Sequence, residues 1–239
     1  MPDPEAGAVA TERLADQDSA GRRPRARRGE GDRLRAEIVD TASRMLAETG
    51  EVGELSLRAV AREVGVAATS IYLHFRSLDE LILAVKIRYF EEFGEALSAA
   101  AEAAGDAPLA RARARAHAYV TYGLANRGSY WVMFSAENVP QHLVPAGTYI
   151  GVQVFEAVRD EIAVVAGPEA DADLLAVHIW TALHGIVTLR TVRRNFPWPD
   201  IDREIDHLID RLLGVPPSGA TSAPPPGGRR PRPGSARRR

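Results

Sequence analysis

The chain has 239 residues, a net charge of −2, a hydrophobic content of 45% and no cysteine. This length allows one large or two small domains with a buried core. The lack of cysteine excludes disulfides, thiolate metal sites and cysteine nucleophiles. Alanine, leucine and arginine dominate long stretches with few turn signals, and no run of alternating strands occurs, so we predict an all-α fold.

The two ends of the chain are rich in arginine and lack apolar periodicity. Residues 1–31 hold five arginines between positions 22 and 28, and residues 215–239 hold six arginines and no acid. We predict a disordered basic leader at 1–31 and a disordered Pro/Arg-rich tail at 215–239. Two interpretations of the leader stay open: it is an arm that follows DNA phosphates, or it is a solvated segment. For the tail, the solvated segment is favoured.

The spacing of apolar residues predicts a first helix over residues 32–49. Its apolar side chains recur at steps of three or four residues: Leu34, Ile38, Ala42, Met45 and Leu46. We expect this face to pack on the next two helices and to complete a three-helix domain over 32–80.

Residues 56–75 have the spacing of a helix-turn-helix, in which two short helices cross. A small residue, Ala61, stands where the helices must approach closely at roughly 90 to 120°. Gly65 follows four residues later and can adopt positive φ, so one helix can end and the next begin. Ile71 supplies an apolar residue between them.

The second helix of this pair is predicted from Ala67 to Phe75. Its outward residues are small or hydrogen-bonding: Ala68, Thr69, Ser70, Tyr72 and His74. Such groups can enter a major groove and bond base edges or phosphates. In the preceding helix, Arg58 can pair with guanine O6 and N7, and Ser56 is placed as the N-cap. Alternatively, these are solvated polar residues of a small helical subdomain.

The segment from Arg33 to Leu81 resembles the DNA-binding domain of the TetR (tetracycline-repressor) family of bacterial regulators. The resemblance rests on AEIVDTASRMLAETG, LSLRAVAREVGV and SIYLHFRSLDEL, with Gly50, Ala61 and Gly65 in register. It implies DNA contacts by seven residues: Ser56, Arg58, Ala68, Thr69, Ser70, Tyr72 and His74.

Two positions depart from the family pattern. Ala67 stands where the family usually has a serine or similar cap, so the recognition helix lacks a capping bond. Leu78 stands where the family usually has a lysine that contacts phosphate, although Arg76 is near enough to substitute. The segment 32–86 is also not globally basic, with seven basic and nine acidic residues.

Glycine and proline positions predict the helices that follow the DNA-binding segment. They fall at 78–101, 107–126, 129–135, 146–165, 171–194 and 200–213. The segments YGLANRGSYWVMF and HIWTALHGIVTLR loosely resemble the ligand-binding and dimerising domain of the same family. We therefore expect residues 81–214 to form that domain.

Apolar stripes on the last two helices are candidates for a homodimer interface. One stripe comprises Leu175, Ile179, Ala182, Ile186 and Leu189, and the other Ile201, Ile205, Leu208, Ile209 and Leu212. A four-helix bundle from two subunits would bury both, and a two-fold dimer reads two half-sites on DNA. Alternatively, the stripes cover the core of one protomer.

Aromatic and polar residues gather in the second half of the chain and are candidates for a small-molecule site. The candidate ligand-binding residues are His117, Tyr122, Tyr130, Trp131, Phe134, Phe155, Trp180 and His184. Together they suit a mostly apolar molecule held by a few polar contacts. The alternative for each of them is a place in the core.

Several function classes find no support in the sequence. His178 and His184 stand six residues apart, about 240° around a helix, so they cannot face one metal together. No HExxH, GxSxG, Walker or GxGxxG pattern occurs, so we expect no enzyme, cofactor or metal. The longest apolar stretch, Leu174–Leu189, is interrupted and short for a membrane span, so we expect a cytoplasmic protein.

The sequence thus predicts a ligand-responsive transcriptional regulator. By the resemblance it is a homodimeric repressor that a small-molecule inducer releases from a palindromic operator in double-stranded DNA. The alternative is a helical small-molecule-binding protein with weak or lost DNA binding.

Overall fold

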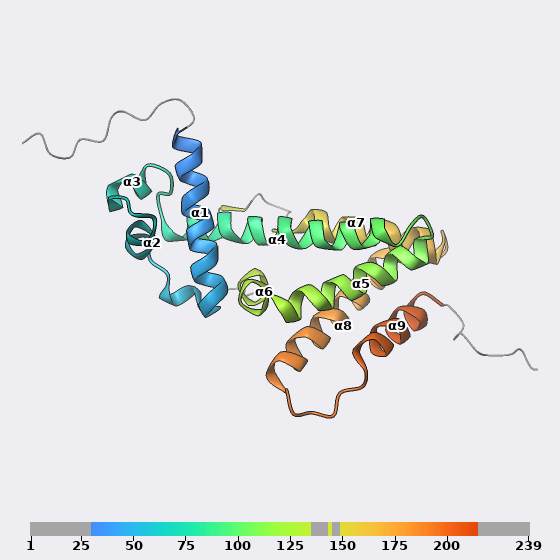
Figure 1. Ribbon diagram of the computed structural model, residues 1–239. Coiled ribbons are helices and arrows are strands. Elements are labelled where there is room, and N and C mark those ends of the chain that lie inside the picture. The colour runs from blue at the N-terminus through green and yellow to red at the C-terminus, as the bar shows by residue number, and fades with distance from the viewer. Residues whose placement is uncertain (1–29, 135–142, 145–148, 215–239) are drawn as a thin grey trace, which may run out of the picture. The chain divides into compact units, whose positions relative to one another are not determined.

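The computed structural model describes residues 30–134, 143–144 and 149–214. The predicted tail, all but the last two residues of the predicted leader, and the first residues of the helix predicted at 146–165 lie outside this range. The described residues contain no strand and are mostly helical, so the predicted all-α class is confirmed (Figure 1). The helices are α1 (Glu30–Thr49), η2 (Val52–Glu54, a 3-10 turn), α2 (Leu57–Val64), α3 (Ala68–Tyr72), α4 (Leu78–Ala103), α5 (Pro108–Ala125), α6 (Arg127–Phe134), α7 (Val152–Ala166), α8 (Ala172–Val192) and α9 (Ile201–Leu212).

The chain divides into two compact units. The first contains the described residues up to Arg88 together with those of 128–146, and the second contains residues 89–127 and the described residues after 147. Helix α4 therefore begins in the first unit and continues in the second, and most of α6 belongs to the first. This division differs from the predicted boundary at residue 80, which was placed from the helix-turn-helix motif alone.

The first unit is built on the packing of α1, α2 and α3 around apolar residues that are withdrawn from water. Helix α1 packs on α2, and α2 packs on α3. Ile38 and Ala42 of α1, Val60 of α2 and Ile71 of α3 are each 0% exposed. The spacing of these residues three or four apart is what makes each helix amphipathic, and burial of those faces holds the three helices together.

Helix α6 joins the first unit through a close contact with the end of α1. A Cβ atom built on Gly128 would lie only 2.0 Å from the carbonyl oxygen of Ala47. Because that obstacle is backbone, it cannot rotate away, and a larger residue would force α6 from α1. The sequence did not indicate this contact.

The second unit is a helical bundle. Helix α5 packs on α7, α8 and α9, and α8 packs on α7 and α9. Ion pairs tie α5 to its neighbours: the Arg111 Nε lies 2.7 Å from Glu161 of α7, Arg115 pairs with the same carboxylate, and Arg113 pairs with Asp210 of α9.

Two predicted helices are shorter in the structure. The helix predicted from 146 begins at Val152, because Gly151 has φ +85° and this left-handed backbone does not continue a helix. The recognition helix predicted from Ala67 to Phe75 is limited to Ala68–Tyr72, and His74 donates its N–H to the Ile71 carbonyl in the turn that follows.

Helix α8 is long and apolar enough to cross a membrane by length and composition. The prediction that this stretch is too short for a membrane span is wrong, because the stretch from Leu174 to Leu189 is only part of a helix of 21 residues. Its buried residues, among them Ile179, Leu183 and Val187, face the bundle of the second unit.

Candidate nucleic-acid interface and ligand region

The turn between α2 and α3 sets the position of the recognition helix. Gly65 has φ +77° and ψ 31°, and its N–H donates to the carbonyls of Ala61 and Arg62. The N–H of Val66 also donates to the Ala61 carbonyl, at 2.9 Å. These bonds satisfy the last carbonyls of α2 and turn the chain sharply, as the glycine spacing predicted.

The helices around this turn are capped unequally. The Ser56 hydroxyl accepts from the Ala59 N–H at 3.2 Å, so the predicted N-cap of α2 is confirmed. Ala67 makes no side-chain cap bond, so the expected missing cap of α3 is also confirmed. Ser77 caps α4 by accepting from the Glu80 N–H at 3.2 Å, a bond that our sequence reasoning missed although Ser and Glu stand three apart.

The seven residues predicted to touch DNA differ in exposure. Ser56, Arg58, Thr69 and Tyr72 are exposed, whereas Ala68, Ser70 and His74 are half-buried. His74 follows the end of α3 and is not part of the helix. Contact of these residues with DNA stays a prediction.

One exposed residue of the recognition helix was absent from the predicted set. Leu73, the C-cap of α3, is 84% exposed and has helical dihedral angles of φ −72° and ψ −20°. It therefore lies on the face of Thr69 and Tyr72, at the i, i+3, i+4 spacing of one helical face. The same spacing was visible in the sequence and could have identified it.

The opposite side of the recognition segment is fixed in the core. Ile71 is 0% exposed and Phe75 is 1% exposed. The guanidinium of Arg35 from α1 lies 4.9 Å from the centre of the Phe75 ring, a cation–π contact that ties α1 to the chain after α3. The orientation of the exposed face is thereby set by buried neighbours.

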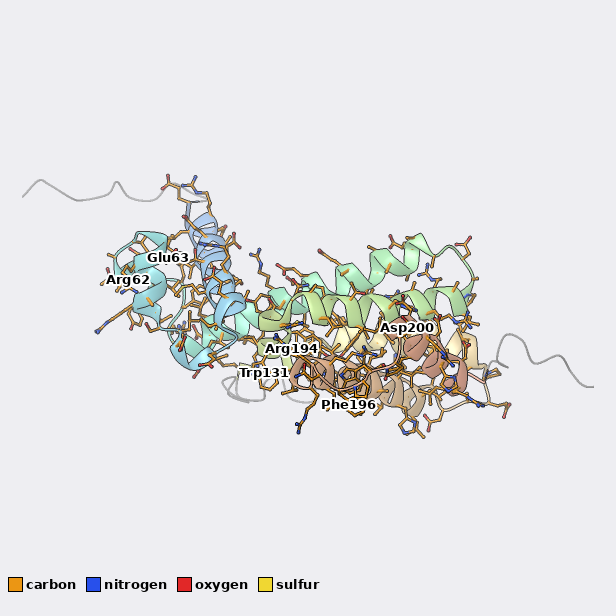
Figure 2. All side chains as sticks on the ribbon, turned by 60° about the horizontal axis from the view of Figure 1, so that its bottom comes forward. Arg62, Glu63, Trp131, Arg194, Phe196 and Asp200 are labelled. Atoms are coloured by element: carbon orange, nitrogen blue, oxygen red, sulfur yellow. The ribbon has the colours of Figure 1, made fainter. Side chains whose placement is uncertain are left out.

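Three exposed arginines belong to the same unit as this face. Arg58 and Arg62 of α2 and Arg76 after α3 are all exposed. Figure 2 shows Arg62 projecting into solvent from α2, beside Glu63, which is also exposed. The first unit thus carries a local set of cations that can meet phosphates although its overall charge is not basic.

The predicted ligand residues fall in both units. Tyr130, Trp131 and Phe134 of α6 belong to the first unit, where Tyr130 is buried and its ring lies 4.7 Å from that of Phe134. Trp131 is exposed, and Figure 2 shows it on the surface of α6.

The other predicted ligand residues lie in the second unit, where Tyr122, Phe155 and Trp180 belong to two aromatic groups. The Tyr122 ring is 5.2 Å from that of Phe93. The Phe155 ring of α7 is 6.1 Å from that of Trp180 of α8, and 6.5 Å from that of Tyr149. These are the edge-on and tilted arrangements that aromatic pairs prefer.

Two titratable groups of this region are biased toward their neutral forms. Burial, assisted by Glu92 and Tyr89, raises the pKa of Tyr122 to about 12. Burial lowers the pKa of His184 below its ordinary 6.5. Both side chains are therefore uncharged near pH 7, which suits a region that takes a mostly apolar molecule.

His117 is engaged by helix α9. Its ring nitrogens lie 3.2 Å from Oδ1 of Asp202 and 3.0 Å from Oδ1 of Asp206. This double contact joins α5 to α9, and contact of His117 with a ligand stays a prediction. Within the described residues no group of three or more His, Asp or Glu could hold a metal ion.

Comparison with known proteins matches both parts of the chain to one family. A family described as "Bacterial regulatory proteins, tetR family" matches residues 38–85, and "Tetracyclin repressor-like, C-terminal domain" matches residues 112–213. An HTH-type transcriptional regulator of Mycobacterium tuberculosis is 27% identical over 198 residues, which cover 79% of this chain and 80% of the relative.

Solved structures show the same fold. A protein with unknown function from Rhodococcus sp. RHA1 aligns with a TM-score of 0.61 and 26% identity, over 81% of this chain and 98% of that one. The multidrug binding protein EbrR, solved with imidazole, aligns with a TM-score of 0.57 and 22% identity, over 78% of this chain and 93% of that one.

Proposed function

Because the chain belongs to the TetR family of bacterial transcriptional regulators, we propose that it is a homodimeric repressor that a small molecule releases from a palindromic operator. The observation that carries DNA binding is the exposed face of α3, placed by the Gly65 turn and fixed from behind by Ile71 and Phe75. We assign the DNA-binding domain to residues 32–80 and the ligand-binding and dimerisation domain to residues 81–214. Helix α6, although within the second range, packs with the first.

The dimer is supported by the exposed face of α8, which differs from the predicted stripe. Ile179 and Ile186 of that stripe are buried in the protomer, as are Ile205 and Ile209 of α9. Besides Trp180, the large apolar residues of α8 that remain exposed are Leu174, Val177, Leu189 and Val192. With Thr181 and Gly185 between them, they follow one helical face at steps of three or four residues.

The ends of α8 favour a second copy in antiparallel orientation. Exposed Asp171 and Asp173 precede or begin the helix, and exposed Arg193 and Arg194 follow it. A two-fold axis across the middle of α8 would set the acids of one copy against the arginines of the other, while the apolar faces meet. Gly185, with open space around its Cα, allows close approach of the helices near that axis.

We place the inducer in the second unit, among the residues that the aromatic groups bring together there. Tyr122, Phe155, Trp180 and His184 supply apolar surface and uncharged polar atoms. EbrR, which shares this fold, is a multidrug binding protein, and this supports a small-molecule ligand for the chain. The alternative, a helical ligand-binding protein without DNA binding, is favoured by the uncapped α3.

The test of the DNA-binding proposal is selection of duplexes from fragmented genomic DNA of the source organism. Wild type, Tyr72→Ala and Tyr149→Ala are compared at moderate salt. Tyr72 and Tyr149 are about equally exposed, at 53% and 50%, but only Tyr72 lies on α3. We expect wild type and Tyr149→Ala to enrich one palindrome and Tyr72→Ala to lose it, with all three proteins folded by circular dichroism.

Two results would count against the repressor. Equal recovery by wild type and Tyr72→Ala would remove α3 as the reading element. No enrichment by wild type, with or without candidate apolar ligands, would favour the alternative function.

A further inference from the structure

The most exposed large apolar side chain in the described part of the chain belongs to the residue that directly follows the recognition helix, its C-cap. Leu73 is 84% exposed, more than any other large hydrophobic residue described, and its neighbour Tyr72 is 53% exposed. A single exposed leucine is ordinary on a protein surface. Leu73 differs from such a residue because it lies beside Thr69 and Tyr72, on the face that is proposed to contact DNA.

We propose that Leu73 reads thymine, by packing its side chain on the C5 methyl group of one thymine in each operator half-site. This inference rests on the proposed function, because it assumes that α3 enters the major groove. It extends that function by naming one base of the operator, a thymine, that the protein selects through an apolar contact.

The position of Leu73 is compatible with contact to a base. Leu73 is four residues after Thr69, so it lies roughly 6 Å further along the same face of α3. The major groove is about 12 Å wide and 8.5 Å deep, so side chains one turn apart on a helix can both reach its floor. Ile71 and Phe75, both buried, prevent the segment from turning this face away.

The chemistry of the groove selects thymine. Among the groups that bases present in the major groove, the thymine methyl is the one apolar group, and the others are hydrogen-bond donors and acceptors. A leucine offers neither donor nor acceptor, so facing any other base it would remove polar atoms from water without replacing their hydrogen bonds. Exposed Arg58, Arg62 and Arg76 of the same unit supply the charge that holds a duplex against it.

The experiment removes the methyl group and the leucine separately and together. Each thymine of the selected operator is replaced singly by deoxyuridine, which lacks only the methyl group. Binding of wild type, Leu73→Ala and Leu73→Met is measured for every duplex. We expect wild type to lose roughly fourfold in affinity at one thymine per half-site, the effect of one buried methyl group.

At that same position Leu73→Ala is expected to bind the thymine and uridine duplexes equally, and Leu73→Met to retain most of the discrimination. At all other thymines the three proteins should respond alike. Because Leu73 is exposed, its truncation should leave the thermal unfolding curve unchanged.

Three results would overturn the inference. If Leu73→Ala weakens every duplex by the same factor, with wild-type sensitivity to uridine retained, the leucine contacts deoxyribose. If Leu73→Ala binds as wild type does, the side chain faces solvent in the complex. If wild type selects no duplex at all, the proposed function fails first, and this inference fails with it.

Discussion

Gly65 holds a backbone conformation that other residues adopt at a cost. Its φ of +77° lies in the left-handed region, where a Cβ atom crowds the following carbonyl oxygen. No atom lies within 4 Å of the position that a Cβ would take, so the cost of replacing Gly65 comes from the backbone and not from a clash. Substitution of Gly65 therefore tests the energetic cost of the left-handed backbone in the turn, without the effect of a steric clash.

We expect Gly65→Ala to lower the free energy of unfolding by about 1 to 2 kcal/mol. The matched control is Gly53→Ala, because Gly53 also has open space around it but no positive φ. Its effect should stay within about 0.5 kcal/mol. Urea unfolding followed by circular dichroism measures both, and equal losses in the two variants would show that the left-handed backbone is not the cause.

His184 makes the stability of the protein depend on pH in a defined direction. Burial lowers its pKa in the folded state below the ordinary value of 6.5. The unfolded chain therefore binds a proton more readily than the folded one. The contribution of neutral His184 to the free energy of unfolding is fully present above pH 6.5, and it is lost as the pH falls through the folded-state pKa of this residue.

We expect His184→Gln to reduce the loss of stability below pH 6.5 relative to wild type. His178→Gln is the control, because His178 lies on the same helix and is exposed. Thermal unfolding between pH 5 and 8, together with NMR titration of the imidazole, provides the measurement. A His184 pKa at or above the ordinary value would contradict the burial argument.

At the level of elements, the helix-turn-helix region, from α2 to the start of α4, contains both capped and uncapped helices. Helices α2 and α4 have serine caps at Ser56 and Ser77, whereas the N-cap of α3 is Ala67, which makes no side-chain bond. A five-residue helix without a cap is not stable by itself. Its geometry is therefore held by the burial of Ile71 and by the bonds of the Gly65 turn.

Helix α8 has two apolar faces, and each has a separate task. One face is buried in the second unit through Ile179, Leu183 and Val187. The other exposes Leu174, Val177, Leu189 and Val192. A helix with two apolar faces needs both to be buried from water, and the proposed partner subunit buries the second face.

We expect Val177→Glu to convert the dimer to monomers, because it would place a carboxylate between the two apolar faces. Val164→Glu is the control, since Val164 is an exposed valine on α7 and not on α8. Sedimentation equilibrium measures the mass of each variant. A dimer that persists in Val177→Glu, or is lost equally in both variants, would show that this face of α8 is not the interface.

For the whole molecule, net charge says little about DNA binding. The chain sums to −2, yet residues 215–239 carry six arginines without an acid, and the segment 32–86 has more acids than bases. Nonspecific affinity depends on the phosphates that cations neutralise, not on net charge. A two-fold dimer doubles the local set of exposed arginines and presents it to half-sites about 34 to 36 Å apart.

The local pattern of the sequence determined most of the turns, caps and buried positions of the helix-turn-helix region. Fixed spacing predicted the Gly65 turn, the Ser56 cap and the buried Ile71, and the departure from the family pattern predicted the missing cap at Ala67; all four predictions are confirmed. These features depend on neighbours within a few residues, so the sequence carries them directly. The end of α3 was missed, because the recognition helix was extended to Phe75, and Leu73 was left out of the predicted face although its spacing from Thr69 indicated it.

Only the tertiary structure decided which residues distant in sequence meet. Periodicity shows that α8 and α9 are apolar, but not which face the protomer buries: of the predicted stripes, Ile179, Ile186, Ile205 and Ile209 are buried in the protomer, whereas Leu189 is exposed. Likewise, nothing local indicates that Gly128 meets the backbone of Ala47, or that His117 lies between two aspartates of α9. The sequence sets the turn and cap of each helix, whereas the choice of buried face depends on the competition among all helices for a shared core.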